Sequence, residues 1–155
     1  MAHDTHHHKE SFITKYIFSQ DHKMIAKQYL LTAIFMGAIG ITLSALFRMK
    51  LGWPDEKFPL LEAILGSDAA PEGLLDSNWY LGLVTLHGTI MVFFVLTGGL
   101  SGTFSNLLIP LQVGARDMAS GLLNMIAYWL FFLSSLLMAV SCLLYTSDAA
   151  DDMAS

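Results

Sequence analysis

Three long apolar segments, separated by polar stretches, dominate the pattern of hydrophobic and polar positions along the chain. They cover about residues 28–47, 79–100 and 122–145. About 20 residues that rise 1.5 Å each are enough to cross the ~30 Å hydrocarbon layer of a bilayer. β-Strands are not expected, because the runs are too long and an open sheet edge cannot face lipid. The pattern therefore predicts an all-α membrane protein with three transmembrane helices.

The polar stretches predict the connections between these helices. Residues 1–26 are expected to form a polar N-terminal segment, and residues 48–78 a long first loop. Within that loop "FPLLEAILG" predicts a short helix, with Pro59 suited to its first turn and Gly66 to its end. The second connection is assigned to "SGTFSNLLIPLQVGARDMASGLLN".

Composition agrees with a membrane protein and narrows its chemistry. The chain is 54% hydrophobic and 14% charged, whereas about a quarter of the residues of a soluble domain are charged. The net charge of −5 gives no indication of nucleic-acid binding. The single cysteine, Cys142, excludes an internal disulfide and a cysteine-based metal cluster.

Basic residues predict the orientation in the membrane. Lys9, Lys15, Lys23 and Lys27 precede the first span, whereas the long loop has three basic residues near its start and six acids. The positive-inside rule therefore places the N-terminus in the cytoplasm and the long loop outside. The N-terminal histidines are expected to be a disordered polar tail rather than a metal site; they are His3, His6, His7 and His8.

His87 is the one histidine or charged residue within the predicted spans. It lies roughly 12 Å below the outer end of the second span, and an ionisable group at that depth is a candidate functional site that must face a bundle interior. Neutral imidazole is a common metal ligand and an axial ligand of haem iron. A zinc or copper ion would require further ligands nearby, and this helix offers none. The alternatives are a haem ligand and a structural histidine that bonds to a neighbouring helix.

Arg48 ends the first span and shares a helix face with Gly40 and Ser44 at four-residue intervals. Two interpretations remain open for it. Its long side chain carries the charge from the helix end to the membrane surface, or its guanidinium donates a hydrogen bond to a polar group of a bound cofactor.

Asp117 is a lone acid in the second connection, with Asn106 and Asn124 nearby. It is expected either to cap the third helix or to take up protons at a membrane entrance, where a carboxylate beside amides suits proton uptake.

Five stretches carry a resemblance to a known family: "DHKMIAKQYLL", "LSALFRMKLGWP", "WYLGLVTLHGTIMVFF", "SNLLIPLQVGARDMASG" and "LNMIAYWLFF". In this order and spacing they resemble the N-terminal quarter of subunit I of bacterial haem-copper oxidases, over about residues 18–140. The resemblance implies that residues 27–141 form the first three helices of a twelve-helix bundle in the bacterial inner (plasma) membrane. His22, in the first stretch, matches a position at the inner membrane border and is given no site.

The same resemblance implies a role for each candidate residue. His87 matches the first axial ligand of the low-spin haem, and Arg48 the arginine that hydrogen-bonds the formyl group of haem a. Asp117 matches the acid at the mouth of the D proton pathway, and Asn106 and Asn124 match asparagines that hold water above that mouth.

The family's activity implies partners that lie outside this chain. Electrons pass from cytochrome c through a copper centre on subunit II to the low-spin haem, and then to a second haem and a copper ion, where oxygen becomes water and protons are pumped. The remaining helices of subunit I, subunit III and the lipid bilayer are further expected partners. This chain alone, with half of a haem a site, is expected to be inactive. A quinol-oxidising member and a small three-helix packing or assembly protein with a structural histidine are the alternatives.

Three positions and the C-terminal stretch depart from the family pattern. Arg116 replaces a common proline, and its charge is expected to lower the pKa of Asp117. Lys50 stands where some members have an acid of an outer cation site, and Met125 where many have a second asparagine. Residues 142–155, "CLLYTSDAADDMAS", are expected to be a non-native tail.

Overall fold

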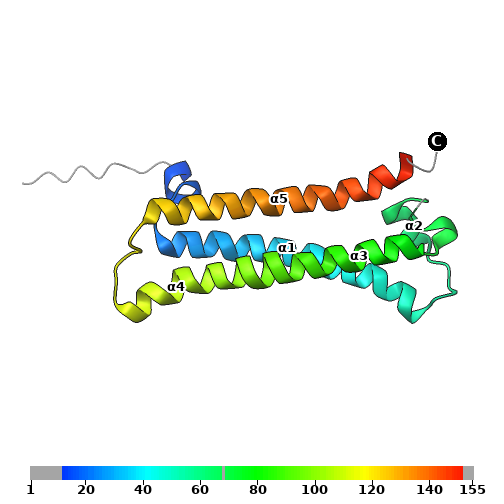
Figure 1. Cartoon of the computed structure of the whole chain (residues 1–155), viewed down its shortest axis with the longest axis horizontal. Helices are drawn as coiled ribbons and strands as arrows, with labels where there is room; N and C mark the ends of the chain where they lie inside the picture. Colours follow the sequence, from blue (N-terminus) through cyan, green and yellow to red (C-terminus); the bar gives the residue numbers. More distant parts are fainter. Residues whose placement is uncertain (1–11, 68, 152–155) are drawn as a thin grey trace, which may run out of the picture.

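The computed structural model describes residues 12–67 and 69–151, which form three long helical rods side by side (Figure 1). The first rod is α1 (His22–Gly52), the second is the unbroken succession of α3 (Ser77–Thr89), η3 (Ile90–Ser101) and α4 (Gly102–Val113), and the third is α5 (Gly121–Asp151). A short π-helical turn, η1 (Ile13–Ile17), precedes α1. No strand occurs among the described residues, and His22–Gly52, Ser77–Val113 and Gly121–Cys142 are each long and apolar enough to cross a membrane. The predicted all-α fold with three spanning helices is confirmed.

Short polar side chains cap the N-terminal ends of the three rods. The carboxylate of Asp21 accepts a hydrogen bond from the backbone N–H of Lys23 at the start of α1, and Asp76 does the same for Asn78 at the start of α3. Such caps satisfy N–H groups that have no partner within the helix. At α5 the cap is Ser120, whose hydroxyl accepts from the N–H of Leu123. The alternative in which Asp117 caps this helix is therefore wrong.

The second rod continues well beyond its apolar centre, and the second connection is shorter than the sequence analysis assigned. The helix runs on to Val113 and ends at Gly114, whose φ of 73° is the left-handed conformation that glycine adopts readily. Pro110 lies in the last turn of this helix, where it has no backbone N–H to donate to the carbonyl one turn earlier. Asn106 consequently lies on a helix and not in a loop.

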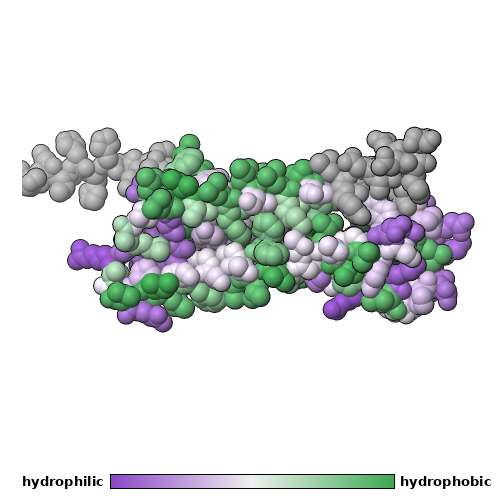
Figure 2. All heavy atoms as spheres, viewed as in Figure 1, coloured by the Kyte–Doolittle hydropathy of each residue, from purple (hydrophilic) through white to green (hydrophobic). Residues whose placement is uncertain are grey.

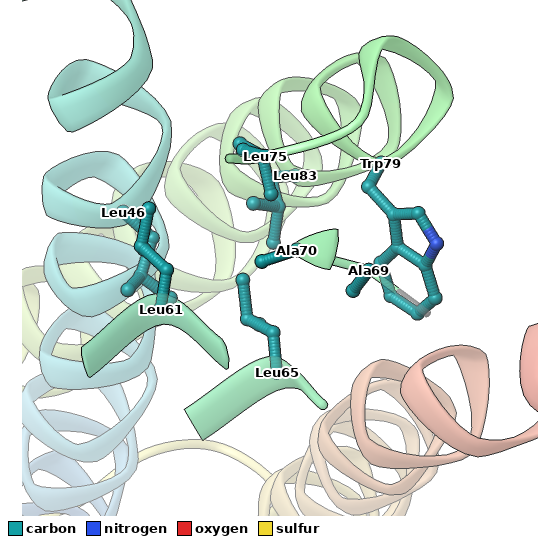
Figure 3. Close-up of a cluster of buried hydrophobic side chains, with 8 residues drawn as sticks. All are labelled: Leu46, Leu61, Leu65, Ala69, Ala70, Leu75, Trp79 and Leu83. Carbon is teal, nitrogen blue, oxygen red and sulfur yellow. The ribbon is translucent and has the colours of Figure 1, made fainter. Parts of the chain in front are cut away.

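The first loop folds into a cap over the ends of α1 and α3. The predicted short helix is confirmed as α2 (Pro59–Leu65), with proline at its start and Gly66 at its end, and a 3₁₀ turn, η2 (Pro71–Gly73), follows. Figure 3 shows side chains of α1, the loop and α3 converging. This buried cluster comprises Leu46, Leu61, Leu65, Ala69, Ala70, Leu75, Trp79 and Leu83. Burial of these apolar groups stabilises the cap and fixes the distance between α1 and α3.

The surface is divided along the length of the rods. Figure 2 shows hydrophobic side chains over the middle of the bundle and hydrophilic ones at its two ends. Leu31 is 68% exposed and Phe35 60%, values that suit contact with lipid or with further helices rather than with water. We refer below to the end that carries His22 as the His22 end and to the other as the cap end.

Candidate functional site

His87 lies on α3, one turn before η3 begins, and its half-buried ring faces α1. Its Nδ1 is 2.8 Å from the carbonyl oxygen of Gly40, and its ring meets the ring of Phe47 edge-on with 5.5 Å between centroids. A carbonyl oxygen can only accept a hydrogen bond, so Nδ1 carries the proton. In the neutral imidazole this leaves Nε2 as the nitrogen with an available lone pair.

Gly40 makes this contact possible. A Cβ atom at this position would lie 2.8 Å from the sulfur of Met91 and 3.3 Å from its Cγ, so any larger residue would have to displace the Met91 side chain. Met91 is one turn beyond His87 on the same face. Close approach at Gly40 thus exposes one backbone carbonyl of α1 to the imidazole.

A histidine ligand of a metal usually donates its other ring N–H to a carbonyl, a carboxylate or water, which fixes its tautomer and orientation. His87 has this arrangement through Gly40. The donor set therefore fits one axial ligand of a haem, with Nε2 as the coordinating atom. Ser44 is buried on the same face of α1, but Arg48 lies exposed at the cap end, eight residues beyond Gly40. The structure brings Gly40, and not Arg48, into hydrogen-bonding contact with His87.

A second polar group forms at the His22 end. His22 is only 2% exposed, and its Nδ1 lies 3.1 Å from Oδ1 of Asp117 and 3.6 Å from Oδ1 of Asp21. Asp117 itself is exposed in the connection between α4 and α5. One ligand atom from each of these three residues lies within 4.8 Å of the others, so the group could also hold a cation. The sequence analysis gave His22 no site.

The pKa of the Asp117 carboxyl is lowered, chiefly because the backbone N–H of Met118 donates a hydrogen bond to it, with a further contribution from His22. The predicted direction of this pKa shift is confirmed. Its predicted cause is wrong, because the Arg116 side chain is not among the groups that lower it. Residue order placed Arg116 beside Asp117, but the fold places the imidazole of His22 there.

An NMR titration tests this cause. Because the folded-state pKa of Asp117 is depressed, its contacts stabilise the fold above the ordinary carboxyl pKa of about 3.9 and are lost as pH falls through the lower folded value. His22→Ala should raise the pKa of Asp117 part of the way toward normal, since the Met118 N–H remains. Arg116→Ala, the matched control, should leave it nearly unchanged. A larger rise with Arg116→Ala than with His22→Ala would contradict the assignment.

Asn106 and Asn124 meet between α4 and α5. The Asn106 Nδ2 donates to the carbonyl of Gly102 at 2.7 Å, which leaves its Oδ1 to accept a hydrogen bond from Nδ2 of Asn124. The same Nδ2 lies 3.1 Å from the sulfur of Met118, whose backbone N–H bonds to Asp117. The structure thus brings the two predicted asparagines together and links them to Asp117 through one residue.

Comparison with known proteins places these residues in a family context. Residues 24–153 match the family model described as "Cytochrome C and Quinol oxidase polypeptide I". The chain is 42% identical over 133 residues to "Alternative cytochrome c oxidase subunit 1" of Bradyrhizobium diazoefficiens, which covers 86% of this chain and 20% of that protein. It is 38% identical over 122 residues to "Cytochrome c oxidase subunit 1" of Tetrahymena pyriformis, covering 79% of this chain and 16% of that protein.

A relative with a different named activity is also similar. "Probable quinol oxidase subunit 1" of Staphylococcus aureus is 34% identical over 141 residues, which is 88% of this chain and 19% of that protein. The chain spans about a fifth of the length of these curated relatives. No solved structure matches it. The chain belongs to the cytochrome c and quinol oxidase polypeptide I family, the haem-copper oxidase subunit I family.

Proposed function

We propose that this chain contributes the first three membrane-spanning helices of the catalytic subunit of a respiratory terminal oxidase, which oxidises cytochrome c, reduces oxygen to water and pumps protons. The family match, the three spans and the environment of His87 support this assignment. The remaining helices of subunit I, subunits II and III and cytochrome c would be its partners. Its location would be the bacterial inner membrane, with the His22 end in the cytoplasm, since basic residues precede α1.

One observation carries the haem assignment: the hydrogen bond from His87 Nδ1 to the Gly40 carbonyl. It orients the ring, keeps Nε2 free to coordinate and increases the basicity of the ligand. A haem iron held by two imidazoles transfers electrons and has no open position for oxygen. Arg48 would donate to the formyl group that distinguishes haem a. The second axial ligand would come from outside this chain.

The second part of the proposal is a proton entrance at the His22 end. Asp117 is exposed and its lowered pKa keeps it anionic at neutral pH. The His22 imidazole, held 3.1 Å away, has ring nitrogens that can donate or accept a proton, and it is placed to exchange one with Asp117. The Asn106 and Asn124 amides, linked to each other, would order water leading inward from the carboxylate.

The proposal of cytochrome c as the electron donor draws support from the relatives. A protein named for cytochrome c oxidation is 42% identical and one named for quinol oxidation 34%, which favours cytochrome c. A small packing protein is the other candidate, because a structural histidine would also bond to a neighbouring helix.

A haem titration separates an oxidase fragment from a packing protein. The purified chain in nanodiscs should bind haem a with a saturable Soret shift at one haem per chain. Added free imidazole should supply the missing axial ligand and convert the bound haem to a low-spin six-coordinate spectrum. A version without residues 1–11 removes the four N-terminal histidines as a source of binding. Absence of saturable binding in this version would contradict the haem proposal and favour the packing role.

A further inference from the structure

A buried pair of hydroxyl groups joins α1 to α5. Thr32 and Tyr128 are each 6% exposed, and the Thr32 Oγ1 lies 3.2 Å from the Tyr128 hydroxyl oxygen. Thr32 Oγ1 also donates to the carbonyl of Gln28 at 3.0 Å. A threonine hydroxyl has a single proton, so Thr32 accepts from Tyr128. The chain of donors runs from Tyr128 through Thr32 to a backbone carbonyl, which has no proton to pass on, and such an arrangement fixes geometry rather than conducting protons.

The asparagine pair depends on how α5 is held. In the half of the bundle that carries α4, Figure 1 shows α1 between α5 and the second rod, and α5 packs chiefly on α1. Among the described residues, the hydrogen bond that crosses from α4 to α5 is the one between Asn106 and Asn124. The two amides therefore have little direct support from an α4–α5 interface. Their alignment is set by the placement of α5 on α1.

Tyr128 is placed to control that alignment. It lies one turn after Asn124 on the same face of α5, about 6 Å further along the axis. Its ring also meets the ring of Tyr29 edge-on, with 5.1 Å between centroids, and Phe131 occupies the space beside Gly98, where a Cβ atom would lie 2.1 Å from its ring. These apolar contacts hold the helices together, but the hydroxyl pair adds the directional bond that fixes the rotation and depth of α5.

We propose that Tyr128 and Thr32 are positioning residues that keep Asn124 aligned with Asn106. The consequence for proton entry rests on the proposed function of the asparagine pair, whereas the alignment itself does not. Loss of either hydroxyl would let α5 rotate or slide. The hydrogen bond between the Asn124 and Asn106 side chains would then open more often, although neither asparagine is changed.

The alignment is tested in this chain by hydrogen exchange of the Asn124 side-chain amide, followed by NMR in nanodiscs. Tyr128→Phe keeps the ring contacts and removes one O–H group, and Thr32→Val removes the acceptor and keeps the branched shape. Each should speed exchange about fivefold, the ratio that loss of one hydrogen bond supports. The double variant should be no faster than the single ones, since both remove the same bond. Ser134→Ala is the matched control, because this exposed hydroxyl on α5 bonds only to its own helix at Leu130.

A functional readout uses an oxidase chimera, in which residues 24–141 replace the matching segment of the Bradyrhizobium relative. Tyr128→Phe should lower the number of protons pumped per electron and leave the low-spin haem spectrum unchanged, since His87 lies on another helix. Should Tyr128→Phe fail to fold, Thr32→Val gives the same readout from the other partner.

Two results would overturn the proposal. If Tyr128→Phe and Thr32→Val lower the melting temperature but leave hydrogen exchange at Asn124 unchanged, the two hydroxyls contribute only to packing. Lost proton uptake with unchanged exchange would make Tyr128 a proton carrier. If Asp117→Asn leaves pumping intact, the proposed proton entrance fails, but the exchange result still decides the positioning role.

Discussion

Replacement of His87 by alanine is expected to lower the affinity of this chain for haem by more than about 10²-fold. Loss of a hydrogen-bond partner of a metal ligand typically costs 10- to 100-fold in affinity, and removal of the ligand itself should cost more. The variant also leaves the Gly40 carbonyl without its imidazole donor. The measurement is a haem titration of the chain in nanodiscs, read at the Soret band with free imidazole present.

His22→Ala is the matched control for this variant. His22 lies on another helix, where it is buried and paired with Asp117 at the His22 end. Removal of the His22 imidazole should change the affinity for haem by no more than about twofold relative to wild type. Distant sites that share no partners rarely affect one another. Equal haem affinity in wild type and His87→Ala, or a larger loss with His22→Ala, would remove His87 from the haem site.

The three spans could be predicted from sequence because lipid imposes a simple constraint. Every backbone group of a span must be satisfied internally, so uninterrupted apolar runs report helices directly. The ends of the helices carry a weaker signal. In "SGTFSN" the small and polar residues suggest a loop, yet the helix continues because Gly102 packs against the ring of Tyr29, where a Cβ atom would lie 2.6 Å from the ring. This tertiary contact is not visible in the local pattern.

The candidate site was predictable only in part, for a related reason. His87 is conspicuous as an imidazole in an apolar run, but its partner is a backbone carbonyl 47 positions away, which any residue possesses. The signal that could have indicated it is Gly40, a small residue on a spanning helix. His22 and Asp117 are 95 positions apart, and only the predicted topology, which puts both at one membrane face, could have suggested that they meet.

The pair of hydroxyls shows the same limit. Thr32 and Tyr128 are 96 positions apart, and each fits its helix as an ordinary interior residue. Nothing in spacing or residue type distinguishes Tyr128 from Tyr29, which lies beside it in the bundle. Which side chains meet between two helices depends on the rotation of each helix about its axis. That rotation is determined by packing, such as the contact of the Phe131 ring with Gly98.

Asp117→Asn in the oxidase chimera is expected to slow proton uptake about 10²-fold, the lower end of what a positioned acid–base group contributes. An amide keeps the size of the side chain and can still accept a hydrogen bond from the Met118 N–H, which is the largest cause of the lowered Asp117 pKa. It cannot take up a proton, and it carries no negative charge. Folding should therefore persist while the entrance stops working.

The measurements are oxygen consumption and proton release by the chimera in vesicles, with Asp76→Asn as the matched control. Asp76 caps α3 at the other end of the bundle and has no place in the proposed entrance. Its variant should keep the cap, since asparagine is about as good an N-cap residue as aspartate, and it should keep its pumping. Asp117→Asn should instead lose pumping and keep its low-spin haem spectrum, because His87 and Gly40 are untouched. Pumping that survives Asp117→Asn at the wild-type rate would show that protons enter elsewhere, and the asparagine pair would then have no carboxylate to serve.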